Sequence, residues 1–347
     1  MKDLTRRDFL KSIGFMGAAA GAPFGLMQDP VPPEAQPAPQ YPVTHWDGSP
    51  FGRILLNVMT IYKEPNWRSG SVGKAYYYDN VVPIEEAVGG PGLYHTNFTW
   101  LKTPDGYIYS SWVQPVTDYP VNPTLEIGEG GAWGQVTVPQ TWSRGAPSDD
   151  SWRHSRLYFG TVNRVVAVEN DYYQVQEIYG AKYWVKAAHM RILAPEELAP
   201  INPHVPPEEK RIVISIRDQR LRCYEGETLV AEFMVSTGMP STPTPHGEFS
   251  VLDKRIGQRM TGGLGAGAYN LPGIPFVCYF TRRWVATHGC YWHNDYGRLH
   301  SNGCVNLLPE NAKWVFRWTT PYVNYWDFKT LPNAEAGQPG TKITVGW

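Results

Sequence analysis

The chain has 347 residues, enough for two or three domains, and 42% of them are hydrophobic, enough to form packed cores. Its net charge of −1 gives no electrostatic basis for binding nucleic acid or an anionic membrane, so we expect neither partner. Four cysteines, at positions 223, 278, 290 and 304, do not make a disulfide framework at this length. Abundant Tyr, Trp, Gly and Pro favour short strands and turns over helical bundles.

Residues 1–27 have the pattern of an export signal. Thr5-Arg6-Arg7-Asp8-Phe9-Leu10-Lys11 matches the twin-arginine motif, and a short, weakly apolar run follows it. The run is too short to span a membrane, and small residues at 20–22 suit cleavage. The alternative is an ordinary basic N-terminus with a chance Arg-Arg pair. We expect export by the twin-arginine route to the cell wall or extracytoplasmic space, with no integral membrane anchor after cleavage.

Residues 28–50 are Pro-rich and are predicted to form an extended linker without a core. The next segment, 51–117, has a strand and turn pattern. Strands are predicted at 54–58 and 80–84, and a hairpin is predicted at 100–109 with its turn at Asp105-Gly106.

After a Gly-rich break at 128–131, residues 130–193 repeat this pattern loosely, with predicted strands near 164–168, 172–175 and 183–185. The two segments resemble bacterial SH3-like wall-binding repeats. This resemblance implies that they hold the protein on cell-wall polymer without taking part in chemistry. Their aromatic side chains fit barrel cores and sugar platforms equally well.

A second Pro-rich joint, 194–210, leads into a further domain at 208–347. Its first segments are predicted strands, beginning with 211–216, and Thr242-Pro243-Thr244-Pro245 is predicted to be a rigid loop. A helix is predicted from Pro309 to Trp318, because proline is tolerated in a first turn and Ala312, Val315, Phe316 and Trp318 make an apolar face.

The stretch 288–306 contains the chemistry of the chain. His288-Gly289 precedes Cys304 by sixteen positions, and Cys304 lies in Ser301-Asn302-Gly303-Cys304-Val305-Asn306. A thiol attacks acyl groups as its thiolate, so it needs a base, and an imidazole can serve as that base. Glycine before the cysteine permits a sharp turn and leaves amide N–H groups able to face an oxyanion.

These positions resemble the L,D-transpeptidase (YkuD) family, whose motif is His-Gly, a gap, and then Ser/Thr-His-Gly-Cys-aliphatic-Arg/Asn. One position departs from the motif: Asn302 replaces the usual second histidine, although His300 lies nearby. The segments at 218–249 also resemble the opening of that family. The resemblance implies a β-sandwich catalytic domain, in a chain that is mainly β with one or two SH3-like β-barrel modules before it.

The resemblance further implies a cysteine L,D-transpeptidase that acts on peptidoglycan stem peptides, without a cofactor or metal. Cys304 would be the nucleophile and His288 the base, with the Gly289 carbonyl orienting the imidazole. The Gly303 and Cys304 amides would hold the oxyanion, with the Asn302 amide as a further candidate. Residues expected to support the loop or the substrate are Ser301, Asn302, Asn306, Trp292 and His300.

Three alternatives remain open from sequence. The fold can serve as an L,D-carboxypeptidase, in which water takes the acyl group, or as a non-catalytic wall-binding protein. The cluster of His288, Cys290, His293, His300 and Cys304 contains zinc-ligand residue types, although its spacing matches no zinc pattern. Cys290 lies two residues from His288, and we considered a disulfide from it to Cys304 beside the alternative of simple packing.

Overall fold

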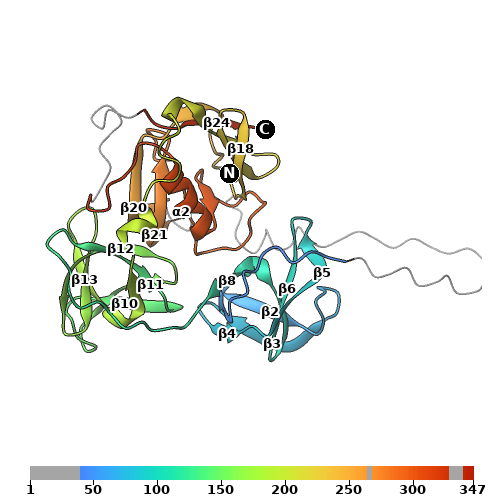
Figure 1. Ribbon diagram of the computed structural model, residues 1–347. Coiled ribbons are helices and arrows are strands. Elements are labelled where there is room, and N and C mark those ends of the chain that lie inside the picture. The colour runs from blue at the N-terminus through green and yellow to red at the C-terminus, as the bar shows by residue number, and fades with distance from the viewer. Residues whose placement is uncertain (1–39, 264–267, 328–338) are drawn as a thin grey trace, which may run out of the picture. The chain divides into compact units, whose positions relative to one another are not determined.

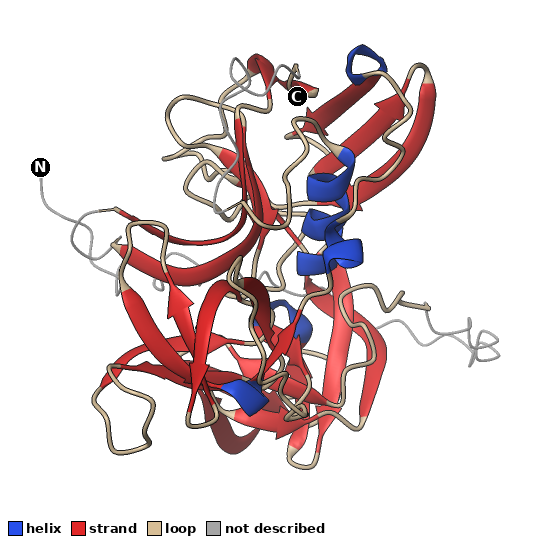
Figure 2. Cartoon of the chain, turned by 60° about the vertical axis from the view of Figure 1, so that its left-hand side comes forward, coloured by secondary structure: helices blue, strands red, loops and turns tan. Residues whose placement is uncertain are grey.

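The structure is a computed structural model that describes residues 40–263, 268–327 and 339–347. The export signal predicted at 1–27 and the start of the Pro-rich segment lie outside these residues. Strands dominate the described part of the chain, so the predicted mainly β class is confirmed (Figure 2). None of the helices in the described ranges has the length and apolar character needed to cross a membrane.

Residues 51–116 form a first strand module. Its elements are β1 (Phe51–Ile54), β2 (Val58–Tyr62), β3 (Ser71–Tyr77), β4 (Val81–Pro83), β5 (Glu86–Tyr94), β6 (Asn97–Thr103), β7 (Gly106–Tyr109), a 3-10 helix (Ser110–Trp112) and β8 (Val113–Val116). They pair in the orders β4-β1-β8 and β3-β2-β7-β6-β5. The predicted hairpin is confirmed, since Thr103 pairs with Gly106 across the turn. The strand predicted at 54–58 is wrong: the apolar run spans the bend between β1 and β2, where Leu56 packs on the module core.

A second strand module follows at 132–192. Its elements are β9 (Ala132–Val136), β10 (Gln140–Arg144), β11 (Arg153–Tyr158), β12 (Val162–Glu169), β13 (Tyr172–Gln176), β14 (Lys182–Lys186), a 3-10 helix (Ala187–His189) and β15 (Met190–Ile192). In both modules a 3-10 helix precedes the last strand, which pairs antiparallel with the first: β8 with β1, and β15 with β9. The loose repeat in the sequence thus has a counterpart in the strand order.

The C-terminal domain holds two further sheets and a helix. Its elements are 3-10 helices at Pro195–Leu198 and Pro207–Glu209, β16 (Lys210–Ser215), β17 (Arg220–Glu225), β18 (Thr228–Met234), β19 (Gly247–Ser250), β20 (Asp253–Gly262), β21 (Tyr269–Tyr279), β22 (Ala286–Gly289), β23 (Val305–Leu307), α2 (Pro309–Trp318) and β24 (Lys342–Gly346). The sheet orders are β18-β17-β16-β24-β19 and β20-β21-β22-β23. The predicted helix is confirmed, with Ala312, Val315, Phe316 and Trp318 buried.

The second module shares a hydrophobic core with the C-terminal domain. Trp133 and Val162 of the module and Leu198 of the Pro-rich joint belong to the same buried cluster as Ile212 and Phe276. β12 lies beside β20 and β21 (Figure 1). The joint at 194–210 is therefore a packed segment, because its 3-10 helix presents Leu198 to a core on both sides.

Residues 40–50, the described part of the Pro-rich segment, are also packed, which differs from the extended linker predicted for 28–50. His45 is 5% exposed, and its backbone N–H donates to Thr99 Oγ1 at 3.2 Å. The ring of Tyr41 lies 5.4 Å from that of Phe98. Extended chain can satisfy its polar groups along a neighbouring strand, and composition alone does not reveal that partner.

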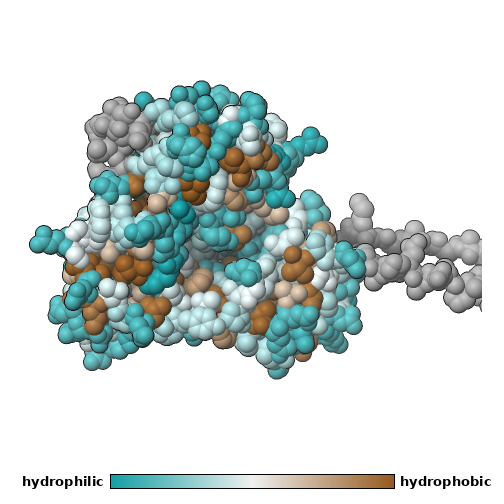
Figure 3. Space-filling view, in the orientation of Figure 1, coloured by the Kyte–Doolittle hydropathy of each residue, from teal (hydrophilic) through white to brown (hydrophobic). Residues whose placement is uncertain are grey.

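On the face of the molecule seen in Figure 3, hydrophobic residues form small groups among hydrophilic ones.

Candidate active site

His288 and Asn306 are paired across the parallel strands β22 and β23. The adjacent pair Thr287 and Val305 belongs to the same register, so Cys304 follows on beside Ala286. Cys304 immediately precedes β23, at a bend. Extending the alternation of side chains by this one residue predicts that Cys304 lies on the face of His288, two residues away, about 7 Å of strand. The opposite face, with Val305, is packed into the core. The fold thus brings together the histidine and cysteine that the sequence singled out.

The imidazole of His288 is held in one tautomer. Its Nδ1 lies 3.0 Å from the Gly289 carbonyl oxygen, so Nδ1 donates and Nε2 keeps its lone pair. His288 is 2% exposed, and burial lowers its pKa to about 4. Gly289 is required by close approach: a Cβ there would lie 2.7 Å from Pro275 Cγ and 3.1 Å from Pro309 Cα.

The thiol of Cys304 is partly exposed and free. It packs against a cluster that includes Ala286 and Tyr279, on which Trp292 also packs. Burial of the thiol raises the pKa of Cys304 to about 11. Its Sγ lies 3.9 Å from the Trp284 carbonyl oxygen, a long contact. At neutral pH the resting site therefore holds a thiol and a neutral imidazole, and proton transfer must accompany attack.

Hydrogen bonds within residues 301–304 hold the loop before Cys304. Ser301 Oγ accepts the Gly303 N–H at 3.1 Å and donates to the Cys304 carbonyl oxygen. Gly303 has φ of +114°, in the region that favours glycine. Its N–H was expected to hold an oxyanion, but in this structure it is occupied by Ser301. The bond to Ser301 does not involve the Cys304 N–H, which stays a candidate donor to the oxyanion.

A second loop, residues 238–244, forms hydrogen bonds to the same turn. Thr244 Oγ1 accepts the Gly238 N–H and donates to the Gly303 carbonyl oxygen, both at 2.8 Å. The Met239 N–H donates to the Ser301 carbonyl oxygen at 2.9 Å. The sequence identified 242–245 as a rigid loop, but it gave no signal that Thr244 would bridge two distant backbone segments.

The predicted substrate residues have different surroundings. Asn302 is exposed, and the half-buried Trp292 lies 5.6 Å from the His288 ring. Asn306 is 1% exposed, and its side-chain amide lies 2.9 Å from Nε2 of His293. The ring of His300, also half-buried, lies 4.0 Å from that of His293. Trp292 and Asn306 are therefore next to the histidine–cysteine face, whereas Asn302 faces solvent.

The disulfide considered between Cys290 and Cys304 is contradicted by the strand register. The Cys290 N–H donates to the Leu307 carbonyl oxygen at 2.9 Å, which extends the β22–β23 pairing by one residue. Cys290 therefore lies four residues beyond the position of Cys304, about 13 Å along the strand, whereas a disulfide needs Cα atoms within about 7 Å. Both cysteines are free. Cys290 is buried, and burial raises its pKa to about 12.

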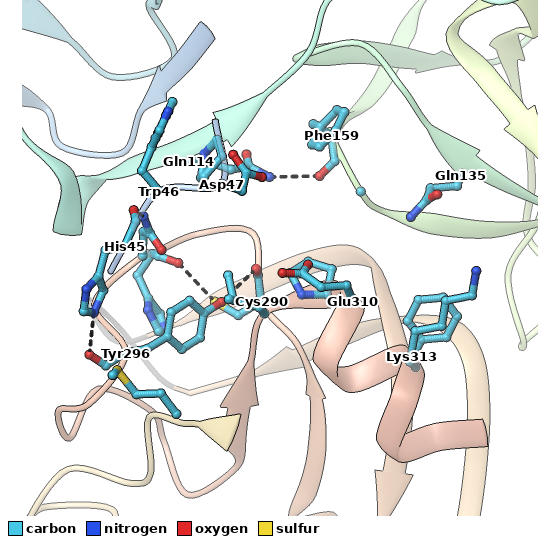
Figure 4. A pocket seen from close by; sticks show the side chains of 18 of the residues that line it. His45, Trp46, Asp47, Gln114, Gln135, Phe159, Cys290, Tyr296, Glu310 and Lys313 are labelled. Carbon is cyan, nitrogen blue, oxygen red and sulfur yellow. Dashed lines mark hydrogen bonds between the residues drawn. The ribbon is translucent and has the colours of Figure 1, made fainter. Parts of the chain in front are cut away.

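A cavity of about 380 Å³ is lined in part by residues that follow His288, among them Cys290 and Tyr296 (Figure 4). Its walls include Trp46 and Gln114 near the first module, Phe159 of the second, and Cys290 and Glu310 of the C-terminal domain. Cys304 is not among its lining residues. In the described part of the chain, no three His, Cys, Asp or Glu side chains are grouped so as to hold a metal ion.

Comparison with known proteins gives matches to the C-terminal domain. Residues 209–345 match the YkuD family, the L,D-transpeptidase catalytic domain. A putative L,D-transpeptidase YkuD of Bacillus licheniformis is 28% identical over 100 residues, which are 28% of this chain and 52% of that protein. The chain thus spans about half the length of this curated relative.

Two solved structures are also similar. An L,D-transpeptidase from Mycobacterium smegmatis matches with 23% identity and a TM-score of 0.33, over 40% of this chain and 59% of that one. The catalytic domain of the E. faecium L,D-transpeptidase matches with 23% identity and a TM-score of 0.31, over 40% of this chain and 98% of that one.

The C-terminal part of the chain is a mainly β domain with a histidine on β22 and a cysteine immediately before the parallel strand β23. Residues 209–345 belong to the YkuD family of L,D-transpeptidase catalytic domains. The family recognised from the sequence is thereby confirmed for these residues. The match does not extend to the two strand modules, whose SH3-like character stays a prediction.

Proposed function

We propose that the protein is a cysteine L,D-transpeptidase that cross-links peptidoglycan stem peptides. The observation that carries this proposal is the register of β22 and β23, which places the partly exposed thiol of Cys304, just before β23, two residues from an imidazole whose Nε2 keeps its lone pair. The family of residues 209–345 supports the substrate class. Export by a twin-arginine signal, which would bring the enzyme to its polymer, is part of the same proposal.

The first half-reaction transfers an acyl group to the protein. Cys304 Sγ attacks the carbonyl carbon that precedes the terminal D-alanine of a stem tetrapeptide, while its proton passes to His288 Nε2. The Gly289 carbonyl stabilises the resulting imidazolium through its contact with Nδ1. The carbon–nitrogen bond then breaks, and the imidazolium proton leaves with the D-alanine amine. The product is a thioester on Cys304.

The second half-reaction returns the free thiol. An amine of a second stem attacks the thioester carbonyl, gives up a proton to His288, and displaces the Cys304 sulfur, which takes that proton back. Water in place of the amine would make the protein a carboxypeptidase. The oxyanion of each step needs an N–H donor, worth about 3–4 kcal/mol in comparable sites. The Cys304 N–H fits that role, and Gly303 joins it once its bond to Ser301 opens.

Intact-mass spectrometry with a carbapenem tests the nucleophile. The full chain should gain one acyl mass, mapped to the peptide that contains Cys304, and Cys304→Ser should gain none. Incubation with disaccharide-tetrapeptide should then release D-alanine and form dimers. Release of D-alanine without dimers would favour the carboxypeptidase, and no adduct together with no release would refute the enzyme.

A further inference from the structure

The segment Tyr291–Tyr296 follows His288 closely and contains none of the strands or helices described above. It carries Trp292, whose ring lies 5.6 Å from His288 and 5.1 Å from Tyr291. Trp292 also packs on the cluster that contacts Cys304. The position of this segment therefore decides what surrounds both reacting groups, and its backbone groups need partners outside a ladder.

The first module and the residues leading into it supply several of those partners. Arg53 Nη2 donates to the Tyr291 carbonyl oxygen at 2.8 Å. His45 Nε2 donates to the Tyr296 carbonyl oxygen at 3.0 Å (Figure 4). Between these two, Asn294 donates its side-chain amide to the His45 carbonyl oxygen at 2.7 Å. The Asn294 backbone N–H donates to a carbonyl of the module's 3-10 helix at 3.0 Å. Both ends and the middle of the segment are thus held from one side.

Arg53 is itself fixed. Its side chain is 1% exposed, and Nη1 donates to Asp79 at 2.7 Å while Nε donates to Gln114 at 2.8 Å. Arg156 of the second module pairs with the other oxygen of Asp79. The guanidinium carbon of Arg53 lies 4.1 Å from the centroid of the Tyr158 ring, which in turn stacks on Tyr291. Three acceptors fix the orientation of the buried Arg53 guanidinium, and its hydrogen bond in turn fixes the position of the Tyr291 carbonyl.

We propose that the first strand module completes the active site, with Arg53 and His45 as positioning residues that hold Tyr291–Tyr296 and, through Trp292, the imidazole of His288. This deepens the proposed transpeptidase function, on which its kinetic test rests. It also replaces the expectation that the modules only tether the enzyme to wall polymer. A tether needs no buried hydrogen bonds to the segment beside the base.

The test compares full-length variants that differ in what they donate to this segment. Arg53→Lys keeps the positive charge. A single ammonium, however, cannot reproduce the planar guanidinium that now donates to three acceptors. His45→Ala removes the donor to Tyr296, whereas His45→Gln keeps an N–H donor at a similar reach. Arg144→Ala is the matched control, since Arg144 is another buried arginine that donates to a backbone carbonyl, Ser151 at 3.0 Å, but within the second module.

Arg53→Lys and His45→Ala should lower kcat for tetrapeptide about tenfold to a hundredfold, because misplacing reacting groups by about 1 Å has that effect. KM should stay within about twofold, and His45→Gln should recover most of the rate. In the two damaged variants, water reaching the imidazole should also move the acid limb of Cys304 acylation toward higher pH. The neighbouring titratable groups, His293 and the Cys304 thiol, are unchanged in all of them.

Arg144→Ala should lower the melting temperature without changing kcat or the acid limb. Folded Arg53→Lys and His45→Ala with kcat and acid limb like those of the unaltered chain would overturn the proposal, as would losses that merely follow melting temperature in all variants. If Arg53→Lys does not fold, the His45 pair decides. If the unaltered chain shows no turnover, the proposed function fails, and iodoacetamide alkylation of Cys304 still reports the position of the imidazole.

Discussion

Asn306 lies directly opposite His288 in the parallel register of β22 and β23. One end of its buried amide meets His293 Nε2 at 2.9 Å, and the other end has no hydrogen-bond partner within the described residues. Leaving a buried polar atom unpaired costs about 1–3 kcal/mol. A group kept at that cost next to His288, the proposed base, is suited to pair with a substrate.

Asn306→Ala should therefore weaken catalysis more than folding. We expect kcat/KM for tetrapeptide to fall about tenfold, which corresponds to the loss of one such hydrogen bond in the transition state. The free energy of unfolding should change by less than about 1 kcal/mol, because the lost contact to His293 is offset by removal of an unpaired atom. Steady-state kinetics and urea unfolding measure the two effects. A large loss of stability with unchanged kcat/KM would make Asn306 a structural residue.

The resting thiol should be protonated at neutral pH. Burial raises the pKa of Cys304 to about 11 and lowers that of His288 to about 4, so a thiolate–imidazolium pair is disfavoured on both sides. Ultraviolet absorbance of thiolate near 240 nm, taken as the difference from Cys304→Ser, should be absent at pH 7 and appear as pH approaches 11. Thiolate absorbance already present at pH 7 would mean that the pair is charged before substrate binds.

The sequence predicted those parts of the fold whose signals are local. The helix at 309–318 and the hairpin at Asp105-Gly106 follow from residues within one or two turns of chain. The same holds for His288-Gly289 and the Gly303-Cys304 turn, where glycine is required by close approach or by positive φ. Short-range patterns are specific because the backbone geometry they need excludes most residues.

The contacts between modules could not be read in this way. Arg53, Asp79 and Arg156 lie far apart along the chain, and each alone is an ordinary surface charge. Only the tertiary fold shows that they meet in a buried group that reaches Tyr291. Likewise, the run at 28–50 has the composition of a linker, while His45 within it is buried by a strand and a loop from elsewhere.

Acid should destabilise the protein through buried histidines. Burial lowers the pKa of His45, His288, His293 and His300, so the folded state binds fewer protons than the unfolded state. Their contribution to stability is present above the unfolded pKa of about 6.5 and is lost as pH falls toward the folded values. For His288, with a folded pKa of about 4, the loss reaches about 3 kcal/mol at pH 4.

Urea unfolding between pH 7 and pH 4 measures this loss. His288→Gln removes one titrating group, so its unfolding free energy should fall less steeply over that range than that of the unaltered chain. Equal slopes for the two proteins would show that His288 is not buried in its neutral form.

The assignment of the nucleophile makes a final prediction about Cys290 and Cys304. Each of the two cysteines directly follows a glycine, Gly289 or Gly303. Cys290 is 3% exposed and contacts the His293 carbonyl, whereas Cys304 is partly exposed. Cys304→Ser should abolish acyl-enzyme formation, because a serine hydroxyl ionises far less readily than a thiol. Cys290→Ser should retain it.

Since the register separates the two sulfurs by four residues of strand, mild oxidant should affect the Cys290→Ser variant and the unaltered chain equally. Peptide mapping of a carbapenem adduct and activity assays after oxidation measure both effects. A label on Cys290, or oxidant resistance confined to Cys290→Ser, would contradict the arrangement described for β22 and β23.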